Sequence, residues 1–382
     1  MRIYLDHNAT TPIRDEVLAA MGGALREHFG NPASAHRHGA AARAELERAR
    51  ERVGGLLRAG PGEIVFTSGA TEANNLAIHG IARALVGRRH LVASAVEHPS
   101  VDEPIDALCA EGWRVTRVRV DGDGRVAPSA VADALEPDTA LVSLIWAHNE
   151  TGAIQPVEEV AEIVRAHGAA LHLDATQAVG RLPLRLAADA LSASAHKFNG
   201  PKGVGFLWLR RGLPLEPFVR GGPQERGRRG GTPNLPGIVG LGVAAELAAR
   251  ELPERAVRDA ALRDRLWEGI AAKVPCVRRN GRPPHLLPNT LNVEFAGAPA
   301  DVLLEALDGE GVSVSAGAAC ASGALHASRA LLAMGRTPEE ARSALRFSVG
   351  HGVDEAQIER VLVVLPDLVE RVRRAVAGGS GT

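Results

Sequence analysis

Lysine is scarce in this sequence, and its placement is informative. The chain has 382 residues and 44 Lys or Arg, yet only Lys197, Lys202 and Lys273 are lysines. Arginine keeps its proton near neutral pH, whereas a lysine amine can lose it and form a Schiff base with an aldehyde. Lys197 also follows the apolar run Ala190–Ala195, so its stem would be half-buried and its pKa lowered by desolvation. The alternative is a lysine at a strand end whose charge reaches solvent.

A second group of candidates follows the β-rich run Glu63–Thr67, where small residues precede a helical pattern. The free backbone N–H groups and the dipole at the start of a helix bind anions. Small residues such as Ala70 would let a phosphate come close to Thr71. The alternative is an ordinary N-cap by Ser68 or Thr71.

The third candidate group is a carboxylate, Asp174. Asp174 stands at the end of the run Ala169–Asp174, where open α/β sheets bind ligands. A buried carboxylate there needs a cation or several donors, although it could also cap the following turn. Thr71, Asp174 and Lys197 would supply a phosphate cradle, an acid for a ring nitrogen and a Schiff-base amine, which are what pyridoxal 5'-phosphate requires. The sequence therefore predicts a pyridoxal-phosphate enzyme.

The three cysteines, Cys109, Cys276 and Cys320, do not form a disulfide framework, and no pair of them has zinc-ligand spacing. We therefore expect a reducing compartment and no metal. Cys320 lies in the segment 315–324, which has no large side chain and little to pack, so its thiol is the candidate for reactivity. We expect Cys109 and Cys276 to be inert, because their contexts are those of a helix face and a strand edge.

The composition excludes several classes of protein. Apolar residues make up 45% and charged residues 23%, as in ordinary globular domains, and the net charge is −1. This balance gives no reason to expect nucleic acid as a partner, even near Arg226, Arg228 and Arg229. No apolar run is long enough for a membrane span, and the first residues lack the apolar core of a secretory signal. We therefore expect a cytoplasmic protein.

Alternating strand and helix patterns must position the candidate residues. Helical patterns at 71–85, 99–111, 128–135 and 156–167 separate many of the β-rich runs, which lie at 63–67, 90–96, 113–118, 139–147, 169–174, 190–195 and 203–209. Such alternation predicts an α/β fold with βαβ crossovers around a mostly parallel, mixed, seven-stranded sheet, in which the last two strands form a hairpin.

A second, smaller unit is predicted toward the C-terminus. Pro253 is expected to break the helical pattern that resumes near residue 237, and we place a boundary there. Beyond it, strand patterns at 289–295, 311–315 and 344–348 alternate with helical patterns, the last of which extends to about residue 377. This arrangement indicates a small α+β domain.

A series of short motifs now identifies a family. The sequence resembles the cysteine desulfurases, pyridoxal-phosphate enzymes of aminotransferase class V, in the branch that serves iron–sulfur cluster assembly and nitrogen fixation. The motifs cover nearly the whole chain in the family's order: Tyr4–Pro12, Asn31–Gly39, Phe66–Asn74, Glu97–Val101, Asn149–Gly152, Gln155–Pro156, Asp174–Gln177, Ser194–Lys197, Gly221–Glu225, Gly231–Asn234, Ala319–Gly323 and Leu345–Ser348. The resemblance implies the type I fold of pyridoxal-phosphate transferases, with a large domain over 15–253 and a small domain that combines 1–14 with 254–382.

The resemblance also implies roles around the cofactor. Lys197 would form the Schiff base, Asp174 would pair with the pyridine nitrogen, and His98 would stack on the ring. Gln177 and Asn149 would hydrogen-bond near the phenolic oxygen or the substrate. The residues implied to hold the phosphate are Ala70, Thr71, Ser194, His196 and, from the neighbouring subunit of a homodimer, Thr232.

The implied reaction removes sulfur from L-cysteine. Arg346 would bind the substrate carboxylate, for which a planar bidentate donor is suited. Lys197 would move the α-proton, and His98 would donate or accept a proton. The Cys320 thiolate would attack the substrate sulfur, so that L-alanine leaves and a persulfide stays on Cys320 for a sulfur-acceptor protein, such as an iron–sulfur scaffold.

Other functions are compatible with the same motifs. The chain could be a selenocysteine lyase or another class V aminotransferase or lyase in which Cys320 is incidental, or a non-catalytic partner protein of the same fold. His98 could be a half-buried structural histidine, and Arg346 a solvated charge at a strand end. The sequence also departs from the family, since Ala318 and Ala319 replace the common Ser-Ala before the cysteine. That change puts the identity of the acceptor in doubt.

Overall fold

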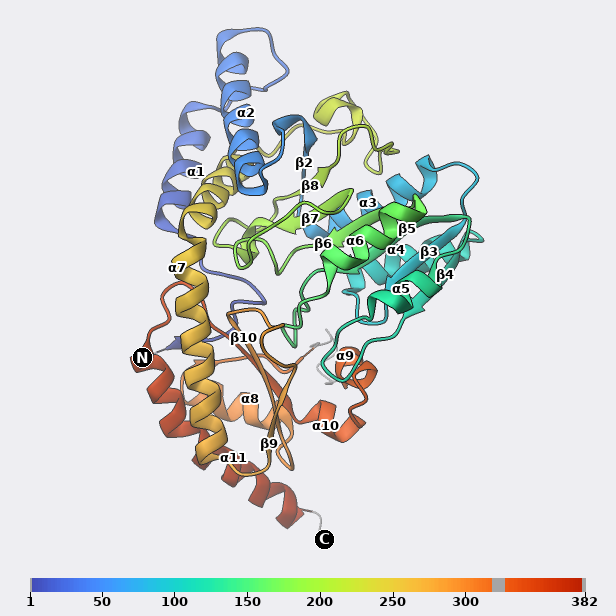
Figure 1. The fold of residues 1–382 in the computed structure, drawn as a ribbon. Helices are drawn as coiled ribbons and strands as arrows, with labels where there is room; N and C mark the ends of the chain where they lie inside the picture. Colours follow the sequence, from blue (N-terminus) through green and yellow to red (C-terminus); the bar gives the residue numbers. More distant parts are fainter. Residues whose placement is uncertain (1, 318–326, 380–382) are drawn as a thin grey trace.

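The computed structural model describes residues 2–317 and 327–379 (Figure 1). The first part of the chain, to residue 209, contains β1 (Ile3–Tyr4), α1 (Asp15–Glu27), α2 (Arg37–Leu57), β2 (Ile64–Thr67), α3 (Ala70–Ala84), β3 (His90–Ser94), α4 (Pro99–Ala110), β4 (Arg114–Val118), α5 (Pro128–Ala134), β5 (Thr139–Ile145), α6 (Val157–His167), β6 (Ala170–Asp174), β7 (Ala190–Ser194) and β8 (Gly205–Leu209). Short 3₁₀ turns lie at Pro61–Glu63 and Ala195–Lys197.

The rest of the chain is richer in helix. It contains the 3₁₀ turn Gln224–Gly227, α7 (Leu235–Lys273), β9 (Val277–Asn280), β10 (Thr290–Phe295), α8 (Ala300–Gly309), β11 (Val312–Ser313), α9 (Arg329–Ala333), α10 (Pro338–Arg342), β12 (Ala344–Ser348) and α11 (Glu355–Gly379).

The central sheet has seven strands in the order β2-β8-β7-β6-β5-β3-β4. Only β8 runs against its neighbours, and the β6–β7, β5–β6, β3–β5 and β3–β4 pairs are parallel. The predicted mixed, mostly parallel sheet and the hairpin of β7 and β8 are therefore confirmed. Because β2 and β7 both oppose β8, the carboxyl ends of β2, β3, β5, β6 and β7 meet at one edge.

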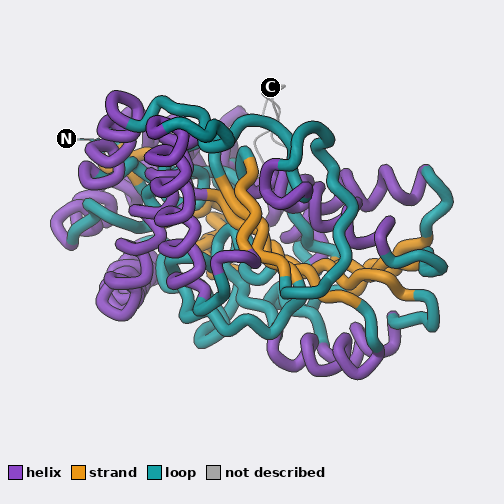
Figure 2. Tube along the Cα trace, turned by 90° about the horizontal axis from the view of Figure 1, so that it is seen from above, coloured by secondary structure: helices purple, strands orange, loops and turns teal. Residues whose placement is uncertain are grey.

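Helices cover both faces of this sheet (Figure 2). Along β3, Leu91 packs with residues of α3 and α4, whereas the adjacent Val92 packs with residues of α5 and α6. Successive side chains of a strand point to opposite faces, so each buried strand serves two cores. This explains the nearly continuous apolar runs in the sequence.

The C-terminal part contains a three-stranded antiparallel sheet, β12-β10-β9, and the parallel pair β1–β11. Its hydrophobic cluster includes Leu291 of β10, Leu345 of β12 and Leu365 of α11. Ile3 and Leu5 belong to the same cluster, although they come from the other end of the sequence. The first residues of the chain therefore pack with its last third.

The helix break expected at Pro253 is wrong. α7 continues through Pro253 over 39 residues and runs beside both the upper and the lower part of the molecule (Figure 1). Proline in a helix interior removes one hydrogen bond and costs about 3 kcal/mol. Packing offsets that cost, because α1 and α2 cover one half of α7 and α11 covers the other. The division of the chain into two domains at this point remains a prediction.

Candidate active site

A cavity of about 720 Å³ lies at the edge where the carboxyl ends of the parallel strands meet. It brings together ten of the residues that the sequence singled out, namely Ala70, Thr71, His98, Asn149, Asp174, Gln177, Ser194, His196, Lys197 and Arg346. Seven of them follow strands of the large sheet, Asp174 and Ser194 are the last residues of β6 and β7, and Arg346 belongs to β12 of the smaller sheet. Asp6, Asn8 and Ala9 of the N-terminal segment also line the cavity.

Lys197 points its amine at backbone oxygens of the N-terminal segment. Its Nζ donates to the carbonyl of Asn8 at 2.7 Å and to that of Ala9 at 2.8 Å. Burial lowers the pKa of Lys197 from 10.5 to about 8, and the charges of Arg181 and Arg346 contribute. A substantial fraction of this amine is therefore neutral near physiological pH, as a nucleophile requires.

Asp174 is buried at the end of β6 and is held by neutral donors. Its Oδ2 accepts from the amide of Asn74 at 2.9 Å, and its Oδ1 accepts from the backbone N–H of Thr176 at 3.0 Å. An ionised carboxylate can accept about four hydrogen bonds, so about two further bonds to Asp174 remain possible. Asp174 can therefore accept a hydrogen bond from a protonated ring nitrogen while it keeps its hydrogen bonds to Asn74 and Thr176.

His98 is the N-cap of α4, and its geometry fixes where its proton sits. Its Nδ1 accepts from the backbone N–H of Ser100 at 3.0 Å, so the proton of the neutral ring lies on Nε2. Burial lowers the pKa of His98, with Asp174 opposing and Lys197 adding to the effect. The imidazole is therefore neutral at pH 7 and presents an N–H donor.

The start of α3, where an anion site is expected, lies at the cavity. No side chain caps this helix, so the backbone N–H groups of its first turn are not occupied by an N-cap side chain. A Cβ on Gly205 of β8 would lie 2.7 Å from the Cα of Gly69, which shows how closely this start packs on the sheet. Thr71, Ser194 and His196 surround it. Burial lowers the pKa of His196 to about 4, so this ring is a neutral partner.

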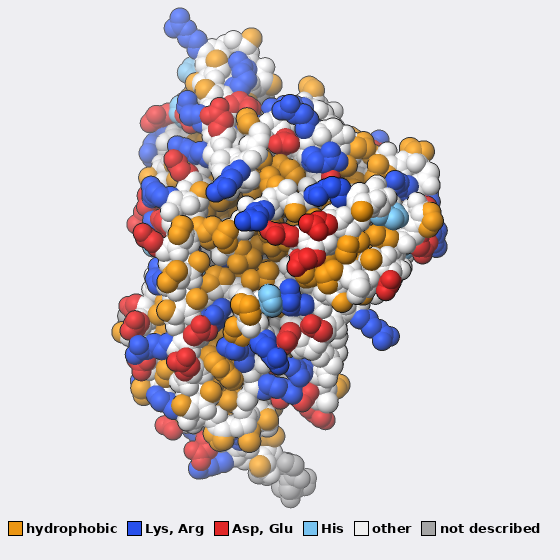
Figure 3. Space-filling model, viewed as in Figure 1, with side chains coloured by type: hydrophobic (Ala, Val, Ile, Leu, Met, Phe, Trp, Pro, Cys, Tyr) orange, Lys and Arg blue, Asp and Glu red, His pale blue; other side chains and the backbone are white. Residues whose placement is uncertain are grey.

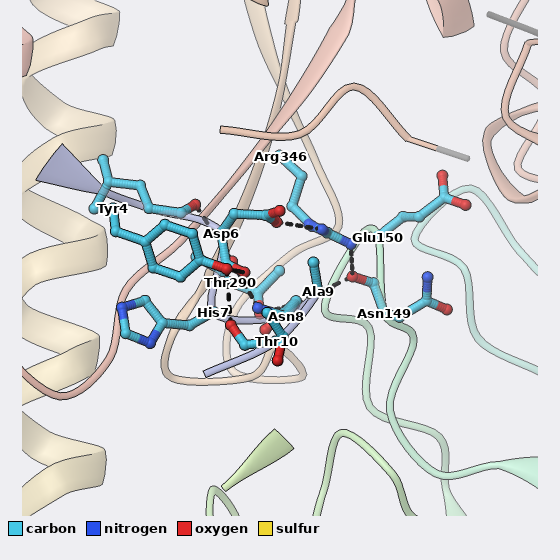
Figure 4. A network of polar contacts seen from close by, with 12 residues as sticks. Tyr4, Asp6, His7, Asn8, Ala9, Thr10, Asn149, Glu150, Thr290 and Arg346 are labelled. Atoms are coloured by element: carbon cyan, nitrogen blue, oxygen red, sulfur yellow. Dashed lines mark hydrogen bonds and ion pairs between the residues drawn. The ribbon is translucent and has the colours of Figure 1, made fainter. Parts of the chain in front are cut away.

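Arg346 is buried at the cavity and bonded on two sides. Its Nη1 donates to the backbone oxygen of Asn149 at 2.9 Å, and its Nη2 pairs with Asp6 Oδ1 at 2.5 Å (Figure 4). The Nε of Arg346 has no partner among the described residues. An orphaned buried donor of this kind is unusual and is consistent with a ligand site.

Arg181 is a residue whose importance the sequence analysis missed. Its guanidinium donates to the side chain of Gln177, and at 3.1 Å to the backbone oxygens of His7 and Lys197. The Gln177 amide N–H is thereby turned toward the Asn8 carbonyl, at 3.0 Å. The motif Tyr4–Pro12 was the only sequence signal that the N-terminal segment takes part in the site.

Among the described residues, one predicted site residue, Thr232, does not line the cavity. Thr232 lines a smaller adjacent hollow, which shares Ser68 and Gly203 with the cavity. Cys320 lies outside the described residues. Of the described residues that precede and follow it in the sequence, Gly317 lines the cavity, and Ser328 donates from its hydroxyl to Glu150 Oε2 at 2.5 Å.

The chain is similar to known proteins over nearly its whole length. The model of the aminotransferase class-V family matches residues 3–361. A cysteine desulfurase of Cereibacter sphaeroides is 50% identical over 377 residues, which cover 97% of each chain. The solved structure of a NifS-like protein superposes with a TM-score of 0.91 at 38% identity, covering 97% of this chain and all of the other. The structure of SspA in complex with cysteine gives a TM-score of 0.81 at 34% identity, with 91% and 99% covered.

The chain therefore belongs to the class-V aminotransferase family. Its relatives place it more narrowly among the cysteine desulfurases of that family. The predicted family, α/β architecture and enzyme class are thereby confirmed.

Proposed function

We propose that this enzyme uses pyridoxal 5'-phosphate at Lys197 to take sulfur from L-cysteine, releasing L-alanine and leaving a persulfide on Cys320. The observation that carries the proposal is the convergence of a lysine of lowered pKa, a buried carboxylate and an uncapped helix start in one cavity. The relatives' activity alone would not say which residues perform it.

The residues present fit this cofactor. Lys197 offers a partly neutral amine to an aldehyde, Asp174 a carboxylate to a ring nitrogen, and the start of α3 an anion site to a phosphate. The buried hydroxyl of Thr176, which lines the cavity, has no partner among the described residues and is a further group that a ligand could satisfy. The cofactor supplies an electron sink that stabilises negative charge on the substrate carbon.

The chain's own groups supply the rest. Arg346 binds the substrate carboxylate, since its guanidinium is already oriented by Asp6 and Asn149. Lys197 Nζ removes the α-proton, and His98, which lines the cavity, provides a proton donor at Nε2–H. The Cys320 thiolate then attacks the substrate sulfur: an S–S bond forms, the C–S bond breaks, and its electron pair goes to the β-carbon. Protonation of the β-carbon and return of a proton to the α-carbon give L-alanine.

The persulfide would then pass to a sulfur-acceptor protein, such as a scaffold for iron–sulfur clusters. We also propose a homodimer in which Thr232 reaches the phosphate of the neighbouring subunit. Charged side chains are mixed over the face seen in Figure 3, and hydrophobic side chains gather across its middle. Leu18, Leu25 and Phe29, on and after α1, are more than half exposed, as in a chain with a partner surface.

The proposed location is the cytoplasm. Cys109 and Cys276 are free, and Cys276 is exposed, which suits a reducing compartment. No helix in the described ranges is both long and apolar enough to cross a membrane.

Incubation with L-cysteine and a reductant tests the activity, with alanine and sulfide measured together. Cys320→Ala should abolish sulfide release while the absorbance of the bound cofactor is retained, because Lys197 is intact. Cys109→Ala is the matched control and should behave as wild type. Undiminished sulfide release from Cys320→Ala would refute the assignment of the thiol. Alanine without sulfide from the wild type would indicate a different lyase reaction.

A further inference from the structure

Asn74 is a buried polar residue to which neither the motifs nor the relatives assign a role. It lies on α3, one turn after Ala70 at the start of that helix, and its side chain is fully buried. Its Nδ2 donates to Asp174 Oδ2 at 2.9 Å and to Ser100 Oγ at 2.9 Å. A single side chain therefore connects α3 with the end of β6 and the start of α4.

The chemistry of the neighbours fixes the direction of these hydrogen bonds. An ionised carboxylate only accepts hydrogen bonds, so the Nδ2 of Asn74, and not its Oδ1, must face Asp174. The second N–H of the amide goes to Ser100, whose own hydroxyl is left to donate to His98 Nδ1 at 2.8 Å. Asn74 Oδ1 has no partner among the described residues. A buried acceptor without a partner is unfavourable, which indicates that this position requires the two donors of the amide.

Asp174 differs from the other carboxylates that line the cavity, because no cation compensates its charge. Asp6 and Glu72 each pair with an arginine, at 2.5 Å and 2.8 Å. Asp174 forms no ion pair within the described ranges, and its partners are the Asn74 amide and the backbone N–H of Thr176. A cation in the place of Asn74 would compensate the charge of Asp174. An amide fixes the carboxylate and leaves its charge for a protonated ring nitrogen.

We propose that Asn74 is the positioning residue for the ring nitrogen of the cofactor, because it orients Asp174 without neutralising it. Ala70 and Asn74 lie one turn apart on α3, so the anion site and the support of Asp174 belong to one rigid helix segment. Through Ser100 the same amide is linked to His98, so the residues for the edge and the face of the ring are held as one unit. The inference rests on the proposed function in one respect, that this cavity binds pyridoxal 5'-phosphate.

Cofactor binding to the full-length apoprotein tests this role without turnover. Pyridoxal 5'-phosphate is compared with its deaza analogue, in which a C–H replaces the ring nitrogen while the aldehyde and the phosphate are retained. Titration followed by absorbance gives a dissociation constant for each ligand. The wild type should prefer the natural cofactor, because only this ligand offers an N–H to Asp174. Asn74→Leu keeps the side-chain volume and removes both donors, and we expect it to weaken pyridoxal 5'-phosphate about tenfold and to change the analogue by less than about twofold.

Loss of this preference is the decisive result, because a displaced α3 or a folding defect weakens both ligands. Asn75→Leu is the matched control, since Asn75 is the next residue of α3 and its Nδ2 also donates at 2.9 Å, but to the backbone oxygen of Thr71. This variant should leave the preference unchanged. Ser100→Ala should lower the preference less than Asn74→Leu does, because Asp174 keeps its amide donor. The double variant should be no worse than Asn74→Leu alone, because Ser100 acts on Asp174 only through Asn74.

Three outcomes would overturn the proposal. If Asn74→Leu weakens both ligands equally, Asn74 only supports the packing of α3, and if it changes neither ligand, Asp174 is positioned without it. Additive losses in the double variant would remove the link through Ser100. Failure of the proposed function is separate: a wild type that binds the cofactor with this preference but releases no sulfide from L-cysteine would remove the reaction and leave the inference standing.

Discussion

Lys197 is predicted to give the pH dependence of cofactor capture. Only the neutral amine can react with an aldehyde, and burial lowers the pKa of Lys197 from 10.5 to about 8. Below pH 8 most of the amine is protonated, so the rate of pyridoxal-phosphate incorporation into the apoprotein should rise with pH up to about 8 and then level off. Absorbance measured after mixing between pH 6 and 10 tests this.

Lys197→Ala is the control for that experiment and should show no such absorbance change. A rate that keeps rising about tenfold per pH unit above pH 9 would show an unperturbed lysine and contradict the environment described here. Arg181→Met removes a charge that lowers the pKa of Lys197 and should move the plateau to higher pH.

At this scale the sequence predicted the residues whose chemistry is distinctive. Lys197, Asp174 and Thr71 stood out because scarcity, strand ends and helix starts are local features. Asp6 and Arg181 could not be found in the same way. Asp6 pairs with Arg346, 340 positions later, and Arg181 donates to the backbone of His7, 174 positions earlier, and such contacts exist only once the fold has formed.

Among the elements, β8 packs closely against both β7 and the start of α3. A Cβ on Gly205 would lie 2.5 Å from the Ala193 carbonyl and 2.7 Å from the Cα of Gly69. Gly205→Ala should therefore lower the free energy of unfolding by about 1–3 kcal/mol and weaken cofactor binding, because the first turn of α3 is displaced. Denaturant unfolding and cofactor titration measure the two effects.

Gly55→Ala is the matched control. Gly55 is exposed in α2, and an added Cβ would meet nothing within 4 Å, so this change should be neutral or stabilising by up to about 1 kcal/mol. If Gly205→Ala behaves like Gly55→Ala, the packing described at the anion site does not matter for binding.

The sequence predicted the elements around the central sheet well, because their apolar runs and prolines mark strand and helix boundaries locally. It failed at α7 and at β9. Pro253 is a strong local signal for a helix end, but packing on both halves of α7 outweighs it. β9, with its sequence Val277-Arg-Arg-Asn280, lacks an apolar run and is a strand only because it pairs with β10.

For the whole molecule, Thr232 tests whether the site is shared between subunits. Suppose that Thr232 binds the phosphate in the site of the neighbouring subunit. Thr232→Val then removes one hydrogen bond to that phosphate and should lower cofactor affinity about tenfold. A dimer mixed from Lys197→Ala and Thr232→Val subunits then has one site with both defects and one intact site. Activity at limiting cofactor should therefore rise above that of either variant alone.

The mixed dimer also has a clear negative result. If Thr232 acts within its own subunit, mixing leaves one site without the lysine and the other without the threonine, and activity stays at the level of the components. Remixing each variant with itself controls for losses during subunit exchange.

Residues 3–8 pair with β11 and β12, more than 300 positions later in the chain. During synthesis the two ends of this arrangement are separated by about one minute of translation at the slowest ordinary elongation rates and by roughly 20 seconds at the fastest. Lys197 is made midway, yet the carbonyls of Asn8 and Ala9 that accept from its amine gain the support of β12 only when that strand leaves the ribosome. A nascent or truncated polypeptide should therefore lack a complete cavity, and we expect desulfurase activity only after the whole chain has been synthesised and folded.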